Sequence, residues 1–211
     1  MIKFIIFVSR IFLVCCIFLF LNCSPSLTKL GFIEPKALSD DEILEIGNGK
    51  FNIKNGSILK LDRARFDTYL DSLKSEELSH DLYQPLQFRY YNKEGELEVL
   101  YANCDVHVEK KKGKYEWYWN KYGTFDSNPP ANPLKKEYLP GTTIRDELSL
   151  YIPLSEKEIS FDNNKPTIIV FWSIELDKHA LELVKLSEQY VTKFDSVNVY
   201  YVNTDEQVLI N

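Results

Sequence analysis

The segment 167–172 constrains the fold of this chain more than any other, because it reads Thr-Ile-Ile-Val-Phe-Trp and is almost continuously apolar. Such a run is typical of a strand in a parallel sheet that is covered on both faces. Apolar residues then recur at helical intervals over residues 177–194, with Asp177 available as the N-cap, and a second apolar strand follows at residues 197–202. The pattern predicts a βαβ unit, whose crossover we expect to be right-handed.

The residues of this unit carry a family resemblance. Residues 165–186 read K-P-T-I-I-V-F-W-S-I-E-L-D-K-H-A-L-E-L-V-K-L, and residues 197–206 read V-N-V-Y-Y-V-N-T-D-E. From residue 159 to residue 206 the chain resembles the first half of a thioredoxin-like domain, in particular that of the envelope thiol-disulfide oxidoreductases. In that family a C-x-x-C motif follows the Phe-Trp pair at the helix start. Leu176 and His179 stand at the two cysteine positions and form a degenerate redox motif.

The replaced cysteines decide what chemistry the resemblance implies. Reaction in that family needs one thiolate at the helix N-terminus and a second thiol that resolves the mixed disulfide. Leu176 can supply neither, and we expect His179 to be a solvated histidine because no further metal ligand is visible nearby. The sequence therefore favours a protein that is not an enzyme, with no catalytic residue, no metal site and no cofactor.

The resemblance also implies a cis-proline loop, a further hairpin and a last helix, and the chain ends at Asn211 before them. Two parallel strands and one helix bury too little apolar surface to be stable alone. We expect the βαβ unit to dock on the N-terminal β region or on a partner. The alternative is that the chain is a truncated relative of a thiol-disulfide oxidoreductase-type envelope protein.

The N-terminus has the layout of an export signal. Basic residues at Lys3 and Arg10 precede an apolar stretch over residues 11–21. The sequence Leu-Phe-Leu-Asn-Cys that ends at Cys23 resembles the lipobox of bacterial lipoproteins, although Asn22 stands where that family has a small residue. The resemblance implies a signal peptide over residues 1–22 and a diacylglycerol, with palmitate as a typical acyl chain, on Cys23. An uncleaved signal anchor and ordinary cleavage are the alternatives.

Charge restricts the partners of the mature chain. Removal of Lys3 and Arg10 leaves 23 basic against 31 acidic residues, a net charge of −8. Such a chain is a poor ligand for nucleic acid, and it gains nothing from an anionic membrane surface. We expect attachment to the inner or the outer membrane through the lipid alone, on the side that faces the periplasm or the exterior, and an envelope protein as a possible partner.

The rest of the sequence, after residue 22, predicts an α+β fold. Residues 23–36 are polar and Pro-broken and form the expected tether, residues 37–127 an α+β domain, residues 128–158 a Pro-rich linker, and residues 159–211 the partial thioredoxin-like segment. The elements expected in residues 37–127 are a helix at 39–46, a hairpin of 51–53 and 58–61 around Asn55-Gly56, a helix at 62–82, and a β-meander of strands 86–91, 97–108 and 115–119. An N-terminal helix and an antiparallel meander thus precede the βαβ unit.

Two groups of side chains within the meander are candidates for chemistry. Cys104 alternates onto the apolar face of its strand and His107 onto the opposite face, so we expect a buried, inert thiol. Thiol chemistry through Cys104 is the alternative function. Tyr115, Trp117 and Trp119 share one face of the next strand, where core packing is favoured over stacking on a sugar.

These observations predict a membrane-anchored envelope lipoprotein with a redox-inactive thioredoxin-like segment and a binding or structural role.

Overall fold

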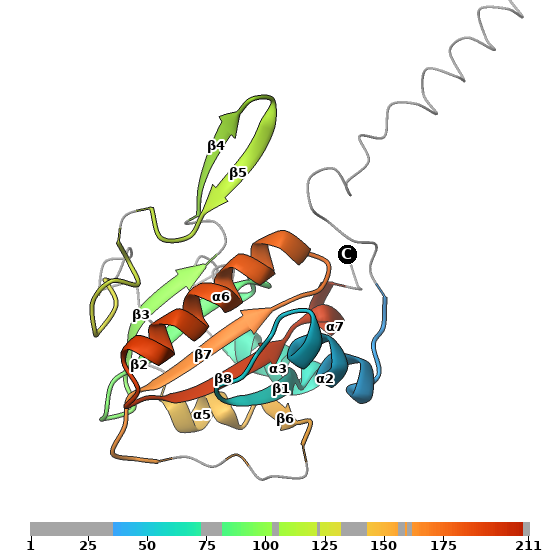
Figure 1. Ribbon diagram of the computed structural model, residues 1–211. Helices are drawn as coiled ribbons and strands as arrows, with labels where there is room; N and C mark the ends of the chain where they lie inside the picture. Colours follow the sequence, from blue (N-terminus) through green and yellow to red (C-terminus); the bar gives the residue numbers. More distant parts are fainter. Residues whose placement is uncertain are drawn as a thin grey trace, which may run out of the picture.

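The computed structural model describes residues 36–72, 82–102, 106–121, 123–131, 143–155, 159 and 162–208. These residues form a six-stranded mixed sheet in the order β3-β2-β7-β8-β1-β6 and a separate two-stranded sheet, β4-β5 (Figure 1). The elements are α2 (Asp40–Gly49), β1 (Ser57–Leu61), α3 (Arg63–Ser72), β2 (Gln87–Tyr91), β3 (Leu97–Ala102), β4 (His107–Lys111), β5 (Lys114–Tyr118), α5 (Ile144–Leu148), β6 (Tyr151–Pro153), β7 (Thr167–Trp172), α6 (Asp177–Lys193), β8 (Asn198–Asn203) and α7 (Asp205–Val208). The expected α+β class is confirmed.

Strand β7 lies inside the sheet, and all six of its residues are buried. It pairs in parallel with β8 on one edge and antiparallel with β2 on the other. Helix α6 connects β7 to β8 and covers one face of the sheet (Figure 1), where it buries Ala180, Leu183 and Val184. The strand, helix and strand expected from the sequence are therefore confirmed, as is their parallel pairing.

Strands from the N-terminal part of the chain complete the sheet around the βαβ unit. The free edge of β8 pairs in parallel with β1, and β1 pairs antiparallel with β6. On the other side, β2 and β3 form an antiparallel hairpin beside β7. The expectation that the unit docks on the N-terminal β region is thus confirmed. Helix α5 and strand β6 lie within residues 128–158, where the sequence predicted a linker.

The predicted three-stranded meander is wrong. Strand β3 ends at Ala102, and within the described ranges β4 and β5 form a separate two-stranded hairpin that projects from the main body (Figure 1). No residue of β4 is fully buried, and the turn after it is built from lysines around Gly113. Three of the five residues of β4 are exposed, Val108 among them, so this strand does not pack an apolar face against the main sheet.

The hairpin predicted around Asn55-Gly56 is also wrong. Residues 51–53 are not a strand, and β1 pairs with β8 and β6 instead. Gly56 has a φ of 110°, and a Cβ atom at this position would lie 2.4 Å from the carbonyl oxygen of Val199. Glycine at this position therefore allows the backbone to pass close to β8. The turn does not reverse the chain to form a hairpin with β1.

The first helix follows its sequence signal. Ser39 is the N-cap of α2. The Glu42 carboxylate accepts a hydrogen bond from the Ser39 backbone N–H, and Ser39 Oγ accepts one from the Glu42 backbone N–H. This reciprocal capping box satisfies two backbone donors that a helix start leaves open. Helix α3 confirms the helix expected from residue 62, and residues 73–81 of that prediction lie outside the described residues.

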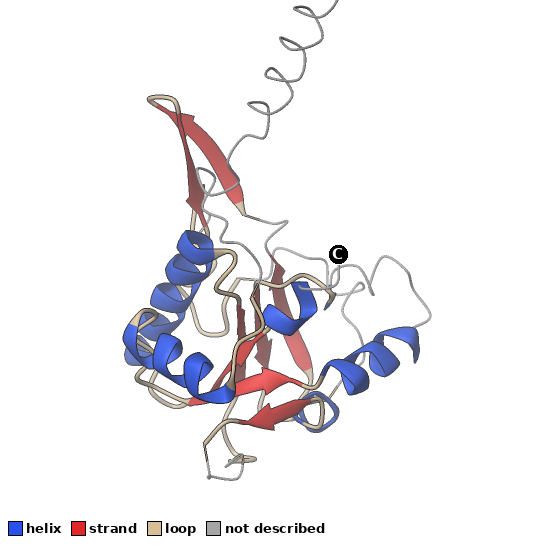
Figure 2. Cartoon of the chain, turned by 90° about the vertical axis from the view of Figure 1, so that its right-hand side faces the viewer, coloured by secondary structure: helices blue, strands red, loops and turns tan. Residues whose placement is uncertain are grey.

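Helices lie on both sides of the main sheet (Figure 2). One face packs against α2 and α6, with Phe88 and Trp172 fully buried among the side chains of this core. The opposite face packs against α3 and α5, with Phe66 and Phe171 in a second core. Alternate residues of β7 thus enter different cores, which explains why its sequence is apolar throughout.

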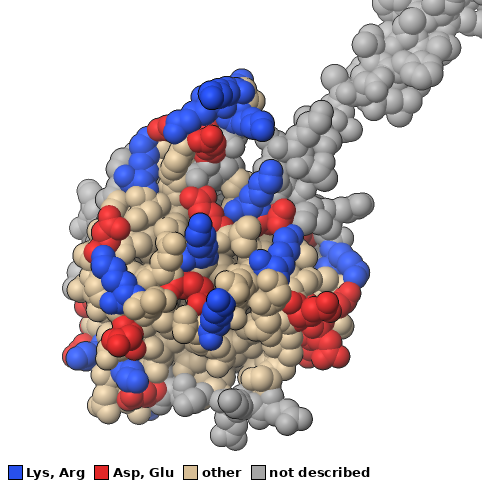
Figure 3. All heavy atoms as spheres, viewed as in Figure 1, with Lys and Arg blue, Asp and Glu red and all other residues tan. Residues whose placement is uncertain are grey.

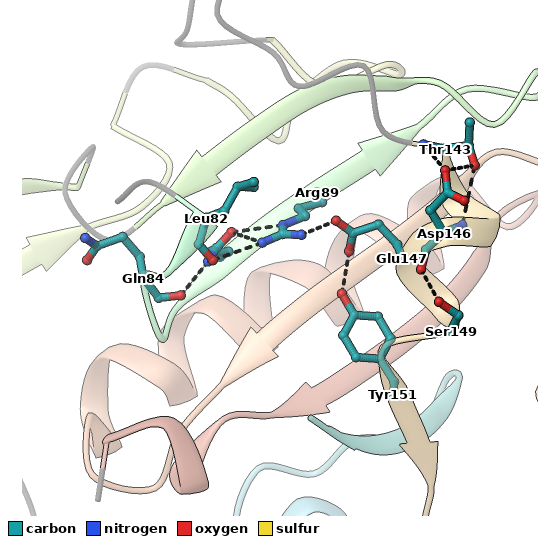
Figure 4. A network of polar contacts seen from close by, with 9 residues as sticks. Leu82, Gln84, Arg89, Thr143, Asp146, Glu147, Ser149 and Tyr151 are labelled. Atoms are coloured by element: carbon teal, nitrogen blue, oxygen red, sulfur yellow. Dashed lines mark hydrogen bonds and ion pairs between the residues drawn. The ribbon is translucent and has the colours of Figure 1, made fainter. Parts of the chain in front are cut away.

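A buried ion pair joins β2 to α5 under the second face of the sheet (Figure 4). Arg89 and Glu147 are both fully buried and contact each other through Nη1 and Oε1. The remaining guanidinium donors reach Oε1 of Gln87 at 2.9 and 2.7 Å and the carbonyl oxygen of Leu82 at 3.2 Å. The Tyr151 hydroxyl donates to the second oxygen of Glu147. Each charge therefore has partners on two sides, which is what makes its burial tolerable.

Replacing one member of this pair should be costly. We expect Glu147→Leu to lower the free energy of unfolding by about 3–5 kcal/mol, because it leaves the Arg89 guanidinium buried without its counter-charge. The double variant Arg89→Met with Glu147→Leu should recover most of that loss, since it removes both charges. Chemical denaturation of the two variants and the unchanged chain measures both values. A loss below about 1 kcal/mol in the single variant would mean that Arg89 reaches water.

Candidate functional site

Leu176 and His179, which the sequence comparison aligned with two redox cysteines, lie at the N-terminus of α6, next to the carboxyl ends of β7 and β8. Leu176 is the N-cap residue of α6 and makes no side-chain capping hydrogen bond. Its side chain is half-buried and packs against the core between α6 and the sheet. Asp177, expected as the N-cap, is instead the first helical residue, and its carboxylate forms an ion pair with Lys50 at 2.5 Å.

The expectation that His179 is solvated is wrong, because its side chain is only 6% exposed. The residue lies one helical turn before Leu183, which is fully buried on the face of α6 that packs against the sheet. Positions four residues apart share a helix face, so His179 is buried with that face. Neither of the two positions presents a reactive group to solvent.

Buried polar residues follow β7 and β8 and meet beside the same helix start. Asp205 Oδ1 accepts hydrogen bonds from the Ser173 hydroxyl at 2.6 Å and from the Ile174 backbone N–H at 2.8 Å. Its Oδ2 accepts a third from Asn203 Nδ2 at 2.6 Å. The Asp205 carboxylate therefore connects the end of β8 to the segment between β7 and α6.

Glu175 brings a second carboxyl group to this cluster. Its side chain is 4% exposed, and its Oε1 is buried without a hydrogen-bond partner in the described part of the chain. Burial and the nearby charge of Asp205 raise the pKa of Glu175 from 4.5 to about 7. Burial also raises the pKa of Asp205, although the donors from Ser173 and Asn203 oppose that shift. The cluster can therefore hold and release a proton near neutral pH.

The carboxyl cluster was not among the residues singled out from the sequence. The available signal was positional: polar residues directly follow two neighbouring parallel strands, at Ser173 and Glu175 and again at Asn203 and Asp205. The carboxyl ends of parallel strands meet at one edge of the sheet, where α/β proteins place their ligands. No group of three or more His, Cys, Asp or Glu side chains able to hold a metal occurs in the described ranges.

Of the other candidate residues from the sequence, some lie outside the described residues and others are placed by the structure. Cys23 and Cys104 lie outside the described residues, as do the two remaining cysteines. Trp119 is fully buried and contacts Tyr101 edge to face with ring centroids 5.6 Å apart, which confirms core packing for this ring. His107 contacts Glu109 at 3.2 Å within β4.

Comparison with known proteins gave no relationship: no protein-family model, no curated protein and no solved structure matched the chain. Across the described stretches, none of the helices combines the length and the apolar composition needed to cross a membrane.

The carboxyl cluster predicts a pH-dependent stability. Because the folded state raises the pKa of Glu175 to about 7, the folded chain binds this proton more tightly than the unfolded chain does. The resulting stabilisation is fully present below pH 4.5 and is lost as the pH rises through about 7. In Glu175→Gln the free energy of unfolding should fall less over this window, as measured by denaturant titration at several pH values. The exposed Glu45→Gln is the matched control, and an unchanged slope in Glu175→Gln would contradict the assignment.

Proposed function

We propose that this protein is a lipid-anchored protein of the bacterial cell envelope, in which a redox-inactive thioredoxin-like unit has a binding or structural role. One observation carries the proposal. The start of α6, where the oxidoreductases that this segment resembles present two thiols, is occupied by the half-buried Leu176 and the buried His179. Disulfide exchange requires an accessible thiolate, and this position offers none.

The arrangement of the main sheet supports the thioredoxin-like part of the proposal. Parallel strands β7 and β8 are joined by α6, and an antiparallel hairpin, β2–β3, lies along the other edge of β7. The family resemblance implies a hairpin after the second strand of the unit. In this chain the β2–β3 hairpin precedes the unit in sequence, and we propose that it replaces the later hairpin in the sheet.

The anchor part of the proposal rests on the N-terminal sequence and on charge. A basic start, an apolar stretch over residues 11–21 and the lipobox-like pentapeptide before Ser24 make Cys23 the residue that would carry the lipid. A mature chain of net charge −8 is not attracted to anionic headgroups. Acyl chains would therefore supply the membrane affinity, and a polar tether would separate them from the folded body.

The anchor is tested by the intact mass of the protein purified from bacterial membranes. We expect a mass that lacks residues 1–22 and includes a diacylglycerol-based modification on Cys23. The Cys23→Ala variant should retain residues 1–22 and carry no lipid. A native protein that keeps its N-terminal residues, or that is cleaved without gaining lipid, would refute the anchor and leave the thioredoxin-like proposal untouched.

Alkylation separates the redox-inactive proposal from thiol chemistry at Cys104. If Cys23 is acylated, Cys104 is the one thiol of the mature chain. We expect it to react with iodoacetamide at pH 7 no faster than a small model thiol, and faster after unfolding in urea, because a structural cysteine is buried and protonated. Native-state labelling well above the model rate would instead support a thiol enzyme. Mass spectrometry of quenched samples follows the reaction.

A further inference from the structure

A cavity of about 610 Å³ lies between the outward face of α6 and the segment that follows α2. This volume is within the range of about 300–1,000 Å³ that is typical of small-molecule sites. Among its lining residues are Phe51, Lys54, Asn55, Leu181, Lys185 and Glu188. The α6 residues among them recur every three or four positions, so they form one stripe of the helix.

Hydrogen bonds fix the wall of this pocket to the helix. Glu188 Oε1 accepts the backbone N–H groups of Lys54 and Asn55, each at 3.2 Å, and its Oε2 accepts Asn55 Nδ2 at 2.7 Å. The Tyr201 hydroxyl donates to Oε1 at 2.8 Å from the sheet beneath. Four donors therefore satisfy the one carboxylate that lines the pocket, and they hold the wall in place without a ligand.

The same wall contains unusual backbone. Asn52 has a φ of 54°, and Gly56 a φ of 110°. A non-glycine residue in the left-handed region costs free energy and persists where the surrounding structure requires it, often at a ligand site. The segment from Phe51 to Gly56 is thus held in one conformation by backbone geometry as well as by Glu188.

The remaining side chains give the pocket an apolar floor and a basic rim. Phe51 is buried at its base, whereas Leu181 is 39% exposed, one of three large apolar side chains with such exposure in the described stretches. Lys54, Lys185 and Lys193 lie on the rim. Lys185 interacts electrostatically with Glu182 on the same helix, and Lys193 donates to the carbonyl oxygen of Asp126 at 2.9 Å. Basic and acidic side chains are interspersed on this face of the molecule, which carries α6 (Figure 3).

We propose that this pocket binds a small organic anion, with its apolar body against Phe51 and Leu181 and its carboxylate beside Lys54 and Lys185. The charge of the rim is the specific argument. The whole chain has a net charge of −6, yet three lysines and one carboxylate line this pocket, so the lining has a net charge of +2. A preformed apolar site with a few placed charges is what small-molecule recognition requires. The proposal does not depend on the lipid anchor or on the thioredoxin-like assignment.

Isothermal titration calorimetry of the full-length protein, with matching detergent solution as the blank, tests this site with 2-naphthoate as the probe. We expect a dissociation constant below about 1 mM, in line with the free energy that a ligand of this size can gain. The neutral 2-naphthamide should bind about tenfold more weakly, because it lacks the charge that the lysines contact. Inorganic phosphate should bind more weakly than 2-naphthoate, since it has no apolar body.

Two charge reversals on α6 form the matched pair of variants. Lys185→Glu should weaken 2-naphthoate binding about tenfold, whereas Lys178→Glu, on the same helix but outside the pocket, should change it less than about twofold. Thermal melts establish that both variants fold. Equal binding of the acid and the amide, equal effects of the two reversals, or no binding of 2-naphthoate by the unchanged protein would each overturn the proposal. Self-association through Leu181 that excludes the probe would do so as well.

Discussion

Strand β7 can be buried only if other strands cover both of its edges and other elements both of its faces. Its six residues are buried, and its apolar residues alternate between the two cores: Ile168, Val170 and Trp172 enter one, and Ile169 and Phe171 the other. One edge is covered by β8, which follows in sequence, and the other by β2, which precedes β7 by about eighty residues. The outer edge of β8 is covered by β1, from still earlier in the chain. Most of the pairing in this sheet is therefore long-range, and the βαβ unit depends on it.

The Arg89–Glu147 pair lies where β2, α5 and β6 meet β7. Arg89 is opposite Ile169 in the pairing of β2 with β7, and its guanidinium lies 4.4 Å from the ring centroid of Phe171. Its counter-charge comes from α5, and the tyrosine that donates to Glu147 begins β6. A buried ion pair adds little net stability over an apolar pair, but it penalises arrangements that leave either charge alone. The pair thus discriminates for the arrangement in which β2, α5 and β6 meet β7.

Local patterns predicted the elements whose signal is contained within a few turns. Helix α2 follows its capping box, and β7, α6 and β8 follow an apolar run, a helical stripe and a second apolar run. Pairing partners could not be read in the same way. The Asn55-Gly56 signal is typical of a hairpin, yet Gly56 is required by its approach to Val199, far away in sequence. The residues that were expected to continue the meander beyond β3 form the separate β4–β5 ribbon. Strand propensity does not specify which sheet a strand joins.

The sequence likewise predicted only the local features of the candidate site. Counting from the Phe-Trp pair placed Leu176 and His179 at the start of α6, as the structure has them, but the burial of His179 depends on how the helix lies on the sheet. Glu175 and Asp205 are thirty residues apart and become neighbours only through the parallel pairing of β7 and β8. The α6 pocket likewise needs Glu188 to meet Lys54 and Asn55 from the other end of the chain. Residue types alone do not predict which distant residues come into contact.

Native-state hydrogen exchange tests most directly whether the N-terminal strands and the βαβ unit form one sheet. If they do, the amides that pair β2 with β7 and β1 with β8 should exchange only through global unfolding, with one common free energy and one denaturant dependence. The β4–β5 ribbon should exchange at a lower free energy, because none of the β4 residues is fully buried. Exchange of β1 and β2 at a free energy well below that of β7 and β8 would mean that the βαβ unit is stable without them, and would contradict a single cooperative sheet.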